Sequence, residues 1–196
     1  MKEKIAMIVF VLVLGTVLTA ALVSVEAFTA PYVAQNKLHK LRVGILKAFA
    51  IEFTAETVDD VYAKSIVEKT VGDKTFFFTP GGEVAYEFSG SGLWGPIRGA
   101  VALERDIQTI KGLIILHQEE TPGLGSRITE AGFLDQFKKK KFAPEMKVQS
   151  PGKASGDSEV EGFTGATLSC KAFERILNSE STKYIKAIKE SAGNGK

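Results

Sequence analysis

Cysteine and histidine are scarce in this chain, and their scarcity excludes several kinds of redox and metal centre. The only cysteine is Cys170, and the only histidines are His39 and His117. A single thiol cannot form a disulfide within the chain, and so few ligands make no Cys/His cluster for zinc or an iron–sulfur centre. Any redox chemistry therefore requires an organic cofactor.

A marked excess of charge is also absent. The formal net charge is +2 over 196 residues, and the first four residues account for +1 of it. Nucleic-acid binding needs a concentrated basic face, so nucleic acid is not expected as a partner. The one block of like charge, residues 138–141, is short and is expected to be a solvated helix end.

One long apolar run stands out near the start of the chain. Residues 5–25 carry no charge, and these 21 residues are enough to cross roughly 30 Å of hydrocarbon at about 1.5 Å per residue. A signal peptide is the alternative, but its apolar region is usually only about 7–15 residues long. We therefore expect an uncleaved single-pass anchor. Lys2 and Lys4 precede the run and Glu26 follows it, which predicts a cytoplasmic N-terminus, a location in the cytoplasmic (inner) membrane and an extracytoplasmic body.

Two helical patterns follow the apolar run. Apolar side chains recur at helical spacing over residues 38–49, which predicts a juxtamembrane amphipathic helix after Pro31. A second helix is predicted over residues 58–69, with Thr57 and Asp60 placed as in a capping box.

Beyond residue 72 the apolar period changes from helical spacing to two. The alternating runs cover residues 76–79, 84–88, 97–103 and 110–116. A Pro-Gly-Gly turn separates the first two runs, which predicts a hairpin and an antiparallel sheet. A short helix over 133–137, a loop over 149–158 and a helix from about Ala166 complete the pattern, with residues 184–188 in a last helix or a continuation. The expected fold class is α+β, with an anchor over 1–30, a helical segment over 31–72 and a sheet domain over 73–196.

Two glycine-containing segments have the character of a binding site. In the loop 120–125, Pro122 followed by Gly123 suits a type II turn, because proline fixes its own φ and glycine accepts a positive one. The segment Thr164-Gly165-Ala166-Thr167 opens a helix, where small residues and unpaired amides favour an anion such as phosphate. An ordinary N-cap is the alternative explanation for these threonines.

Three blocks in this order resemble one family, the FMN-binding domain of the NqrC subunit of Na⁺-translocating NADH:quinone oxidoreductase and of the RnfG subunit of the Rnf complex. The blocks are Gly92-Leu93-Trp94-Gly95-Pro96-Ile97, His117 with Glu120-Thr121-Pro122-Gly123-Leu124-Gly125, and Thr164-Gly165-Ala166-Thr167-Leu168-Ser169. The resemblance implies covalent FMN, joined by a phosphoester to Thr167 and installed by a flavin transferase that uses FAD. By the same resemblance, the other candidates for cofactor binding are Thr164, Gly165, Ala166, Leu168, Ser169, Glu120, Thr121, Gly123, Leu124, Gly125, Leu93 and Trp94.

The chain departs from the family pattern at two positions. Glu161 stands where the family usually has aspartate, and Thr164 stands where it usually has serine. Leu93 and Trp94 are candidates for packing near the flavin, with core packing as the alternative for the tryptophan. Cys170 is expected to be a small buried apolar group.

The resemblance also implies a function. The chain is expected to be a one-electron relay in a multi-subunit, ion-translocating complex of the Rnf type, with ferredoxin and NAD⁺ as terminal redox partners and other membrane and redox subunits as neighbours. The alternatives are the NqrC subunit of the NADH:quinone reductase, a stand-alone extracytoplasmic electron carrier, and an anchored assembly module without flavin.

Overall fold

The computed structural model describes residues 2–72, 74–142 and 145–193. The chain divides into two compact units, a first one that ends at His39 and a body that begins at Lys40. This division differs from the expected bounds at residues 30 and 72, because the segment from Lys40 onward packs into the core of the body.

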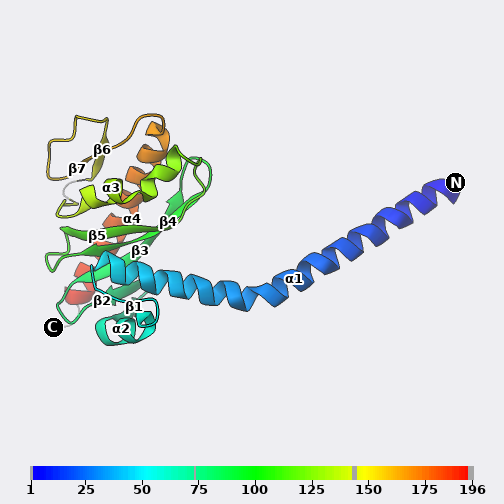
Figure 1. Cartoon of the computed structure of the whole chain (residues 1–196), viewed down its shortest axis with the longest axis horizontal. Helices are drawn as coiled ribbons and strands as arrows, with labels where there is room; N and C mark the ends of the chain where they lie inside the picture. The colour runs from blue at the N-terminus through cyan, green and yellow to red at the C-terminus, as the bar shows by residue number, and fades with distance from the viewer. Residues whose placement is uncertain (1, 73, 143–144, 194–196) are drawn as a thin grey trace. The chain divides into compact units, whose positions relative to one another are not determined.

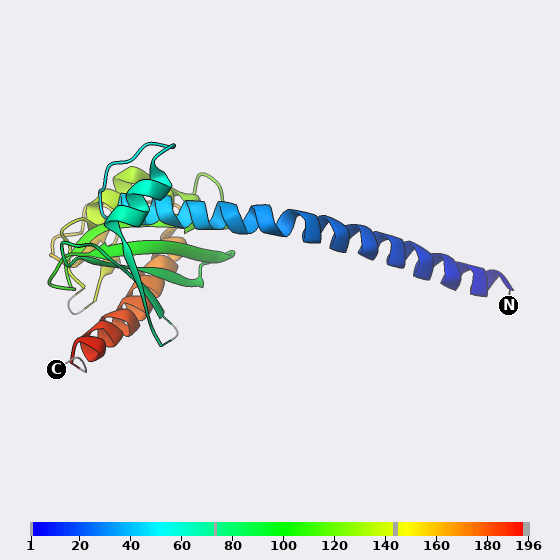
Figure 2. The same cartoon turned by 90° about the horizontal axis from the view of Figure 1, so that it is seen from below.

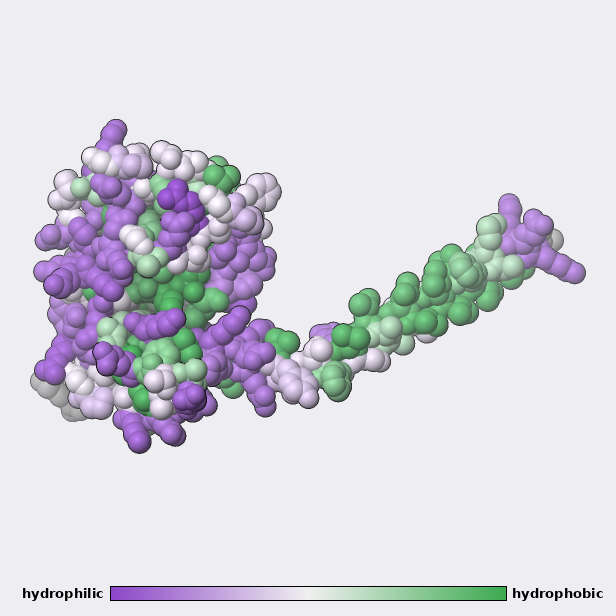
Figure 3. Space-filling view, viewed as in Figure 1, coloured by the Kyte–Doolittle hydropathy of each residue, from purple (hydrophilic) through white to green (hydrophobic). Residues whose placement is uncertain are grey.

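The first unit consists of most of helix α1, which runs without a break from Lys2 to Ala48 and contains Pro31. Its apolar part is exposed along its whole length and forms a continuous green surface in Figure 3. The hydroxyls of Thr16, Ser24 and Thr29 donate to carbonyls four residues earlier, so these polar groups are satisfied within the helix. Among the described residues α1 is the one helix long and apolar enough to cross a membrane, which supports a single-pass anchor.

The body is built on a five-stranded antiparallel sheet with the strands in chain order (Figure 1). The strands are β1 (Val67–Val71), β2 (Lys74–Phe78), β3 (Val84–Ser91), β4 (Pro96–Leu103) and β5 (Ile110–His117). The expected hairpin and the two strands after it are confirmed as β2 to β5. Period-two alternation identified them because successive side chains of a strand point to opposite faces of the sheet.

The prediction of a helix over residues 58–69 was wrong at its end. Helix α2 covers Val58–Ser65, and β1 begins two residues later and pairs with β2. The capping box is also absent, because Thr57 makes no cap hydrogen bond and its Oγ1 accepts from the N–H of Thr54 at 2.9 Å. Strand pairing therefore overrides the helical pattern that residues 66–69 continue.

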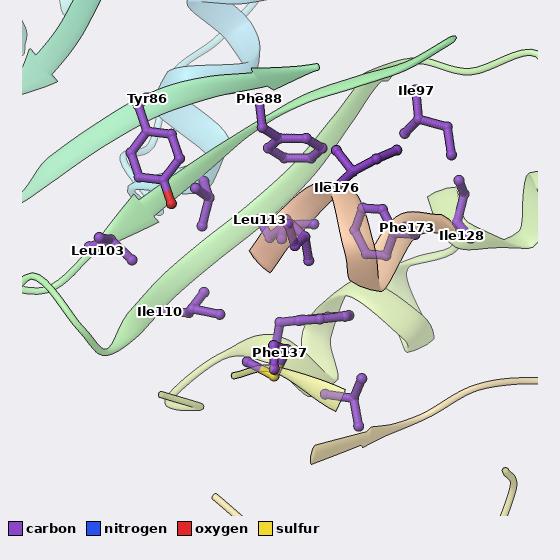
Figure 4. Packing of buried hydrophobic residues seen from close by; sticks show 14 of the residues in the cluster. Tyr86, Phe88, Ile97, Leu103, Ile110, Leu113, Ile128, Phe137, Phe173 and Ile176 are labelled. Atoms are coloured by element: carbon purple, nitrogen blue, oxygen red, sulfur yellow. The ribbon is translucent and has the colours of Figure 1, made fainter. Parts of the chain in front are cut away.

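Helices cover both faces of the sheet, as Figure 2 shows. On one face lie the end of α1 and α2, where Ile45 and Leu46 pack against Phe77 and Ala100. On the other face lies α4 (Thr167–Gly193), whose Phe173 packs with Phe88 of β3 (Figure 4). The smaller elements on this second face are η1 (Gly125–Thr129), α3 (Ala131–Leu134), η2 (Asp135–Phe137), β6 (Lys147–Gln149) and β7 (Glu159–Glu161).

Side chains of α4 hold the short strand β6 in place, and β7 pairs with β6 in parallel. Asn178 bonds both the N–H and the carbonyl of Met146, at 2.9 and 2.8 Å, and Glu174 accepts from the N–H of Val148 at 2.5 Å. The predicted loop over 149–158 connects these two strands, which were not themselves predicted. The predicted last helix is the continuation of α4.

Candidate functional site

The three sequence blocks, which lie far apart along the chain, meet at the carboxyl group of Glu120. Its Oε1 accepts hydrogen bonds from the N–H groups of Leu93 and Trp94, at 2.7 and 3.3 Å. Its Oε2 accepts from Ser169 Oγ in the first turn of α4, at 2.6 Å. Glu120 is 4% exposed and Ser169 is 2% exposed, so this junction lies out of contact with bulk water.

Two glycines leave the room that this carboxyl group occupies. A Cβ at Gly92 would collide with Glu120 Oε1, and a Cβ at Gly125 would lie 2.8 Å from Oε2 and 2.5 Å from Ser169 Oγ. Such separations are below the normal contact distance. The glycines of the first and second blocks therefore have a steric purpose at this junction.

The loop after β5 forms the expected type II turn. Leu124 N–H donates to the Thr121 carbonyl at 3.1 Å across Pro122 and Gly123, and Gly123 has φ +73°. Ser126 Oγ accepts from the Gly123 N–H at 3.0 Å and closes the turn from the other side. Thr121 itself is exposed, and its carbonyl is the part of the residue that organises the loop.

The turn also reaches the third block through Leu124. A Cβ at Gly165 would lie 3.2 Å from Leu124 Cδ2, so these two segments are neighbours. Gly165 has φ +86°, a conformation that glycine adopts without the steric cost of a side chain. The second and third blocks are thus in contact at two points, between Leu124 and Gly165 and between Glu120 and Ser169.

Thr167 is the first residue of α4, and its side chain is exposed. The Cys170 N–H donates to the Ala166 carbonyl at 3.0 Å, which places Ala166 at the N-cap position. Alanine has no side-chain acceptor for the first helical N–H groups, so Ala166 does not cap the positive end of the helix beside the exposed Thr167. This arrangement suits a phosphate group held at Thr167.

Four large apolar side chains remain exposed around this helix start. The exposed fractions are 47% for Leu93, 72% for Trp94, 46% for Leu124 and 65% for Leu168. All four are attached to the segments that Glu120, Ser169 and Gly165 bring together. The segment from Ser89 to Pro96, which includes Leu93 and Trp94, lines a pocket of about 470 Å³. Trp94 is therefore not a core residue, and an exposed apolar group of this kind fits a flat, largely apolar ring.

Glu161, which stands in place of the usual aspartate, is engaged within the protein. Its carboxyl group accepts from the Gly152 N–H at 3.0 Å. The side chain of Gln136 bonds both the N–H and the carbonyl of Glu161, at 2.8 and 3.1 Å. Nearby, Arg127 lies 4.7 Å from the ring centre of Phe163.

The remaining candidates have structural positions. Cys170 is buried, as expected, and burial raises the pKa of its thiol. His117 ends β5, and its Nε2 lies 3.0 Å from an oxygen of Glu119. Sequence reasoning placed Glu120 in the loop without seeing that it is the buried junction of the site. The signal that could have found it is the combination of this glutamate with glycines in the same blocks, which leave room for a close approach.

The geometry defines a class of protein: a helix-anchored α+β domain with an exposed threonine at the start of a helix and a group of exposed apolar side chains around it. The sequence of residues 92–179 matches the FMN-binding domain family. This match confirms the resemblance drawn from the three blocks.

The matched relatives carry a common name. Over 112 residues the chain is 38% identical to the NqrC subunit of the Na⁺-translocating NADH-quinone reductase of Chlamydia muridarum, a match that covers 46% of this chain and 35% of that protein. It is 36% identical to the NqrC subunit of Vibrio alginolyticus over 102 residues, which covers 49% of this chain and 40% of that protein. The chain thus spans between a third and two fifths of these relatives.

Two solved structures share the fold. The NqrC subunit from Parabacteroides distasonis superposes with a TM-score of 0.70 at 27% identity, over 80% of this chain and 94% of that chain. NqrC from Shewanella oneidensis superposes with a TM-score of 0.67 at 21% identity, over 78% of this chain and 99% of that chain. The expected fold class, an apolar N-terminal helix and an antiparallel sheet with flanking helices, is therefore confirmed.

Proposed function

We propose that this chain carries FMN through a phosphoester on Thr167 and serves as a membrane-anchored electron-transfer subunit of an ion-translocating oxidoreductase. The observation that carries the proposal is the position of Thr167. It is an exposed residue at the start of α4, at the point where the three family blocks converge. The match of residues 92–179 to the FMN-binding domain family supports it.

The residues around Thr167 fit the two ends of FMN. The uncapped first turn of α4 would hold the phosphate, because Ala166 leaves the helix N–H groups unpaired by any cap of its own. The exposed side chains of Leu93, Trp94, Leu124 and Leu168 would shield the ring. Bound there, FMN would supply the electron-transfer chemistry, and a link through its phosphate leaves the tuning of its potential to packing and hydrogen bonds.

Attachment requires only the Thr167 hydroxyl and a donor. We propose that a flavin transferase uses FAD, so that Thr167 Oγ1 bonds to the phosphorus of the FMN half. The bond from that phosphorus to AMP breaks, AMP leaves, and the hydroxyl proton is released. The exposed position of Thr167 leaves room for the transferase.

Two complexes are candidates for the assembly. We favour an Rnf-type ferredoxin:NAD⁺ oxidoreductase as the first candidate. The alternative is the NqrC subunit of the Na⁺-translocating NADH-quinone reductase, which the names of the matched relatives support. Affinity purification of the tagged full chain from its native membrane, with identification of the co-purifying subunits, separates the two. Purification without integral membrane subunits would contradict both.

We also propose that the N-terminus is cytoplasmic and the body extracytoplasmic, in the cytoplasmic (inner) membrane. Lys2 and Lys4 before the apolar run support this orientation. Protease added to intact spheroplasts should digest the body. Protection of the body would overturn the orientation.

The test of the flavin proposal is Thr167→Ala, produced together with the flavin transferase and compared with Thr164→Ala. The first variant should show the unmodified intact mass and no fluorescence after denaturing electrophoresis, while the second should keep at least part of its flavin. Thr167 is exposed, so its replacement should cost well under about 1 kcal/mol of stability. Covalent flavin on the Thr167→Ala chain would refute the assignment, and an unmodified wild-type chain would favour the assembly module.

A further inference from the structure

We propose that Glu120 is a positioning residue that assembles the flavin site before any flavin is attached. Its carboxyl group ties the Leu93–Trp94 turn to the first turn of α4, and through that tie it fixes the apolar side chains around Thr167. The effect on flavin depends on the function proposed above, whereas the tie itself is a property of the protein alone.

The hydrogen bonds of Glu120 reach in both directions along the chain. Two donors, the N–H groups of Leu93 and Trp94, come from 27 and 26 residues earlier, and the third, Ser169 Oγ, comes from 49 residues later. Both carboxyl oxygens are therefore engaged by protein donors. This makes Glu120 a residue that acts on the cofactor through others, in contrast to a direct cofactor ligand.

The packing around the carboxyl group shows that the tie is built into the site. Gly92 and Gly125 approach it so closely that a methyl group at either position would meet a carboxyl oxygen. The Gly92 N–H also donates to the Gly95 carbonyl at 2.9 Å and closes a turn. The two amides inside this turn, those of Leu93 and Trp94, donate to Glu120. A buried acceptor with three donors leaves the turn little freedom, because releasing it would leave polar groups unpaired.

The consequence falls on Trp94. Its backbone N–H is held by Glu120 while its side chain is 72% exposed. An exposed aromatic ring on a fixed backbone is preorganised for a ligand, because less conformational entropy is lost when the ligand arrives. Without Glu120, the turn and the helix start would move independently.

Trp94 is the only tryptophan of the chain, so its fluorescence reports on this turn alone. The full chain is purified in detergent from cells that lack the flavin transferase, and is thus free of covalent flavin. In Glu120→Ala we expect lower fluorescence anisotropy of Trp94 and roughly two- to tenfold faster hydrogen exchange in the peptide that contains Leu93 and Trp94, the range given by loss of one net hydrogen bond. Unchanged anisotropy and exchange in a folded Glu120→Ala chain would overturn the proposal.

Two further variants separate positioning from a general effect on stability. Glu120→Gln should restore both signals, because the amide oxygen can accept from the turn and the amide N–H₂ can donate to Ser169 Oγ. Glu56→Ala is the matched control for the loss of a carboxyl group, because Glu56 is exposed and lies outside the three blocks. A Glu120→Gln chain that behaves like Glu120→Ala would contradict the proposal.

Ser169→Ala decides the matter if Glu120→Ala fails to fold. It removes the bond to α4 and keeps the bonds to the turn, so exchange of the hydrogen-bonded amides from Cys170 onward at the start of α4 should rise roughly two- to tenfold. Unchanged exchange there would overturn the proposal. With the transferase present, the flavin midpoint should shift in Glu120→Ala and return in Glu120→Gln. A wild-type chain that takes up no flavin would refute the proposed function. The Trp94 measurements would still test whether Glu120 links the turn to α4.

Discussion

Replacing Gly125 by alanine should destabilise the body by crowding the buried junction at Glu120. The added Cβ would lie 2.5 Å from Ser169 Oγ, 2.8 Å from Glu120 Oε2 and 2.9 Å from Glu120 Cβ. All three atoms belong to side chains that are at least 96% buried, so they cannot swing into solvent to make room. The junction must therefore stretch or break a hydrogen bond.

The expected cost is that of inserting a methyl group into a well-packed interior, about 1–3 kcal/mol. For a domain of this size each kcal/mol lowers the melting temperature by roughly 2–4 °C, which gives a decrease of roughly 2–12 °C. Breaking the Ser169 hydrogen bond outright would place the value near the upper end, because a buried hydroxyl would lose its acceptor.

The assay is thermal unfolding of the full chain in detergent, followed by circular dichroism. Gly132→Ala is the matched control, because it makes the same change in α3, where no atom lies within 4 Å of the added Cβ. We expect this control to be neutral or slightly stabilising, since alanine favours a helix over glycine. Equal melting temperatures for Gly125→Ala and the wild type would refute the packing argument.

Three further predictions concern other parts of the body. Gly123→Val should cost about 1–3 kcal/mol of stability through backbone strain alone, because φ is +73° and no atom lies within 4 Å of the added Cβ. The variant should keep the Thr167 phosphoester but shift the midpoint potential of the flavin. An unchanged midpoint in a redox titration would show that the turn is merely structural. Phe173→Ala should lower the free energy of unfolding by about 3–5 kcal/mol, measured with urea, because the ring is fully buried. Cys170 should react slowly with a thiol reagent in the folded chain and rapidly in urea, because burial raises the pKa of its thiol. For the same reason, the contribution of this thiol to stability should be complete below its unfolded-state pKa of about 8.5 and should decline as the pH rises above that value.

The strands with a recognisable apolar pattern could be predicted from the sequence. The strands that form only because they pair with a neighbouring strand could not. Strands β2 to β5 were found because apolar residues recur along each of them, since each strand contributes side chains to the core clusters on both faces of the sheet. Strand β1 has the burial pattern of a largely exposed edge, so it carries no apolar alternation to recognise. Strands β6 and β7 have three residues each; β6 is bonded by Glu174 and Asn178 of α4, and β7 pairs with β6, contacts that no local pattern encodes.

The candidate site shows the same division. The type II turn at Gly123 and the helix start at Thr167 follow from local chemistry, and the first is confirmed by the backbone geometry. The burial of Glu120 depends on three segments closing around one carboxyl group, which no window of sequence contains. A glutamate in a loop is usually solvated, so propensity pointed away from its actual position.

The packing of the end of α1 determines where a soluble fragment of this protein can begin. Ile45 and Leu46 are fully buried, and a Cβ at Gly112 of β5 would collide with the Ala48 carbonyl, so the last turns of the helix are fixed against the sheet. A fragment that began at residue 73 would leave Phe77 and the alanines beside it uncovered in water. A detergent-free fragment for crystallisation or titration should therefore start at or before Lys40, inside a helix and not at a linker. The anchor cannot be trimmed to the edge of the family match without cutting into the interior of the protein.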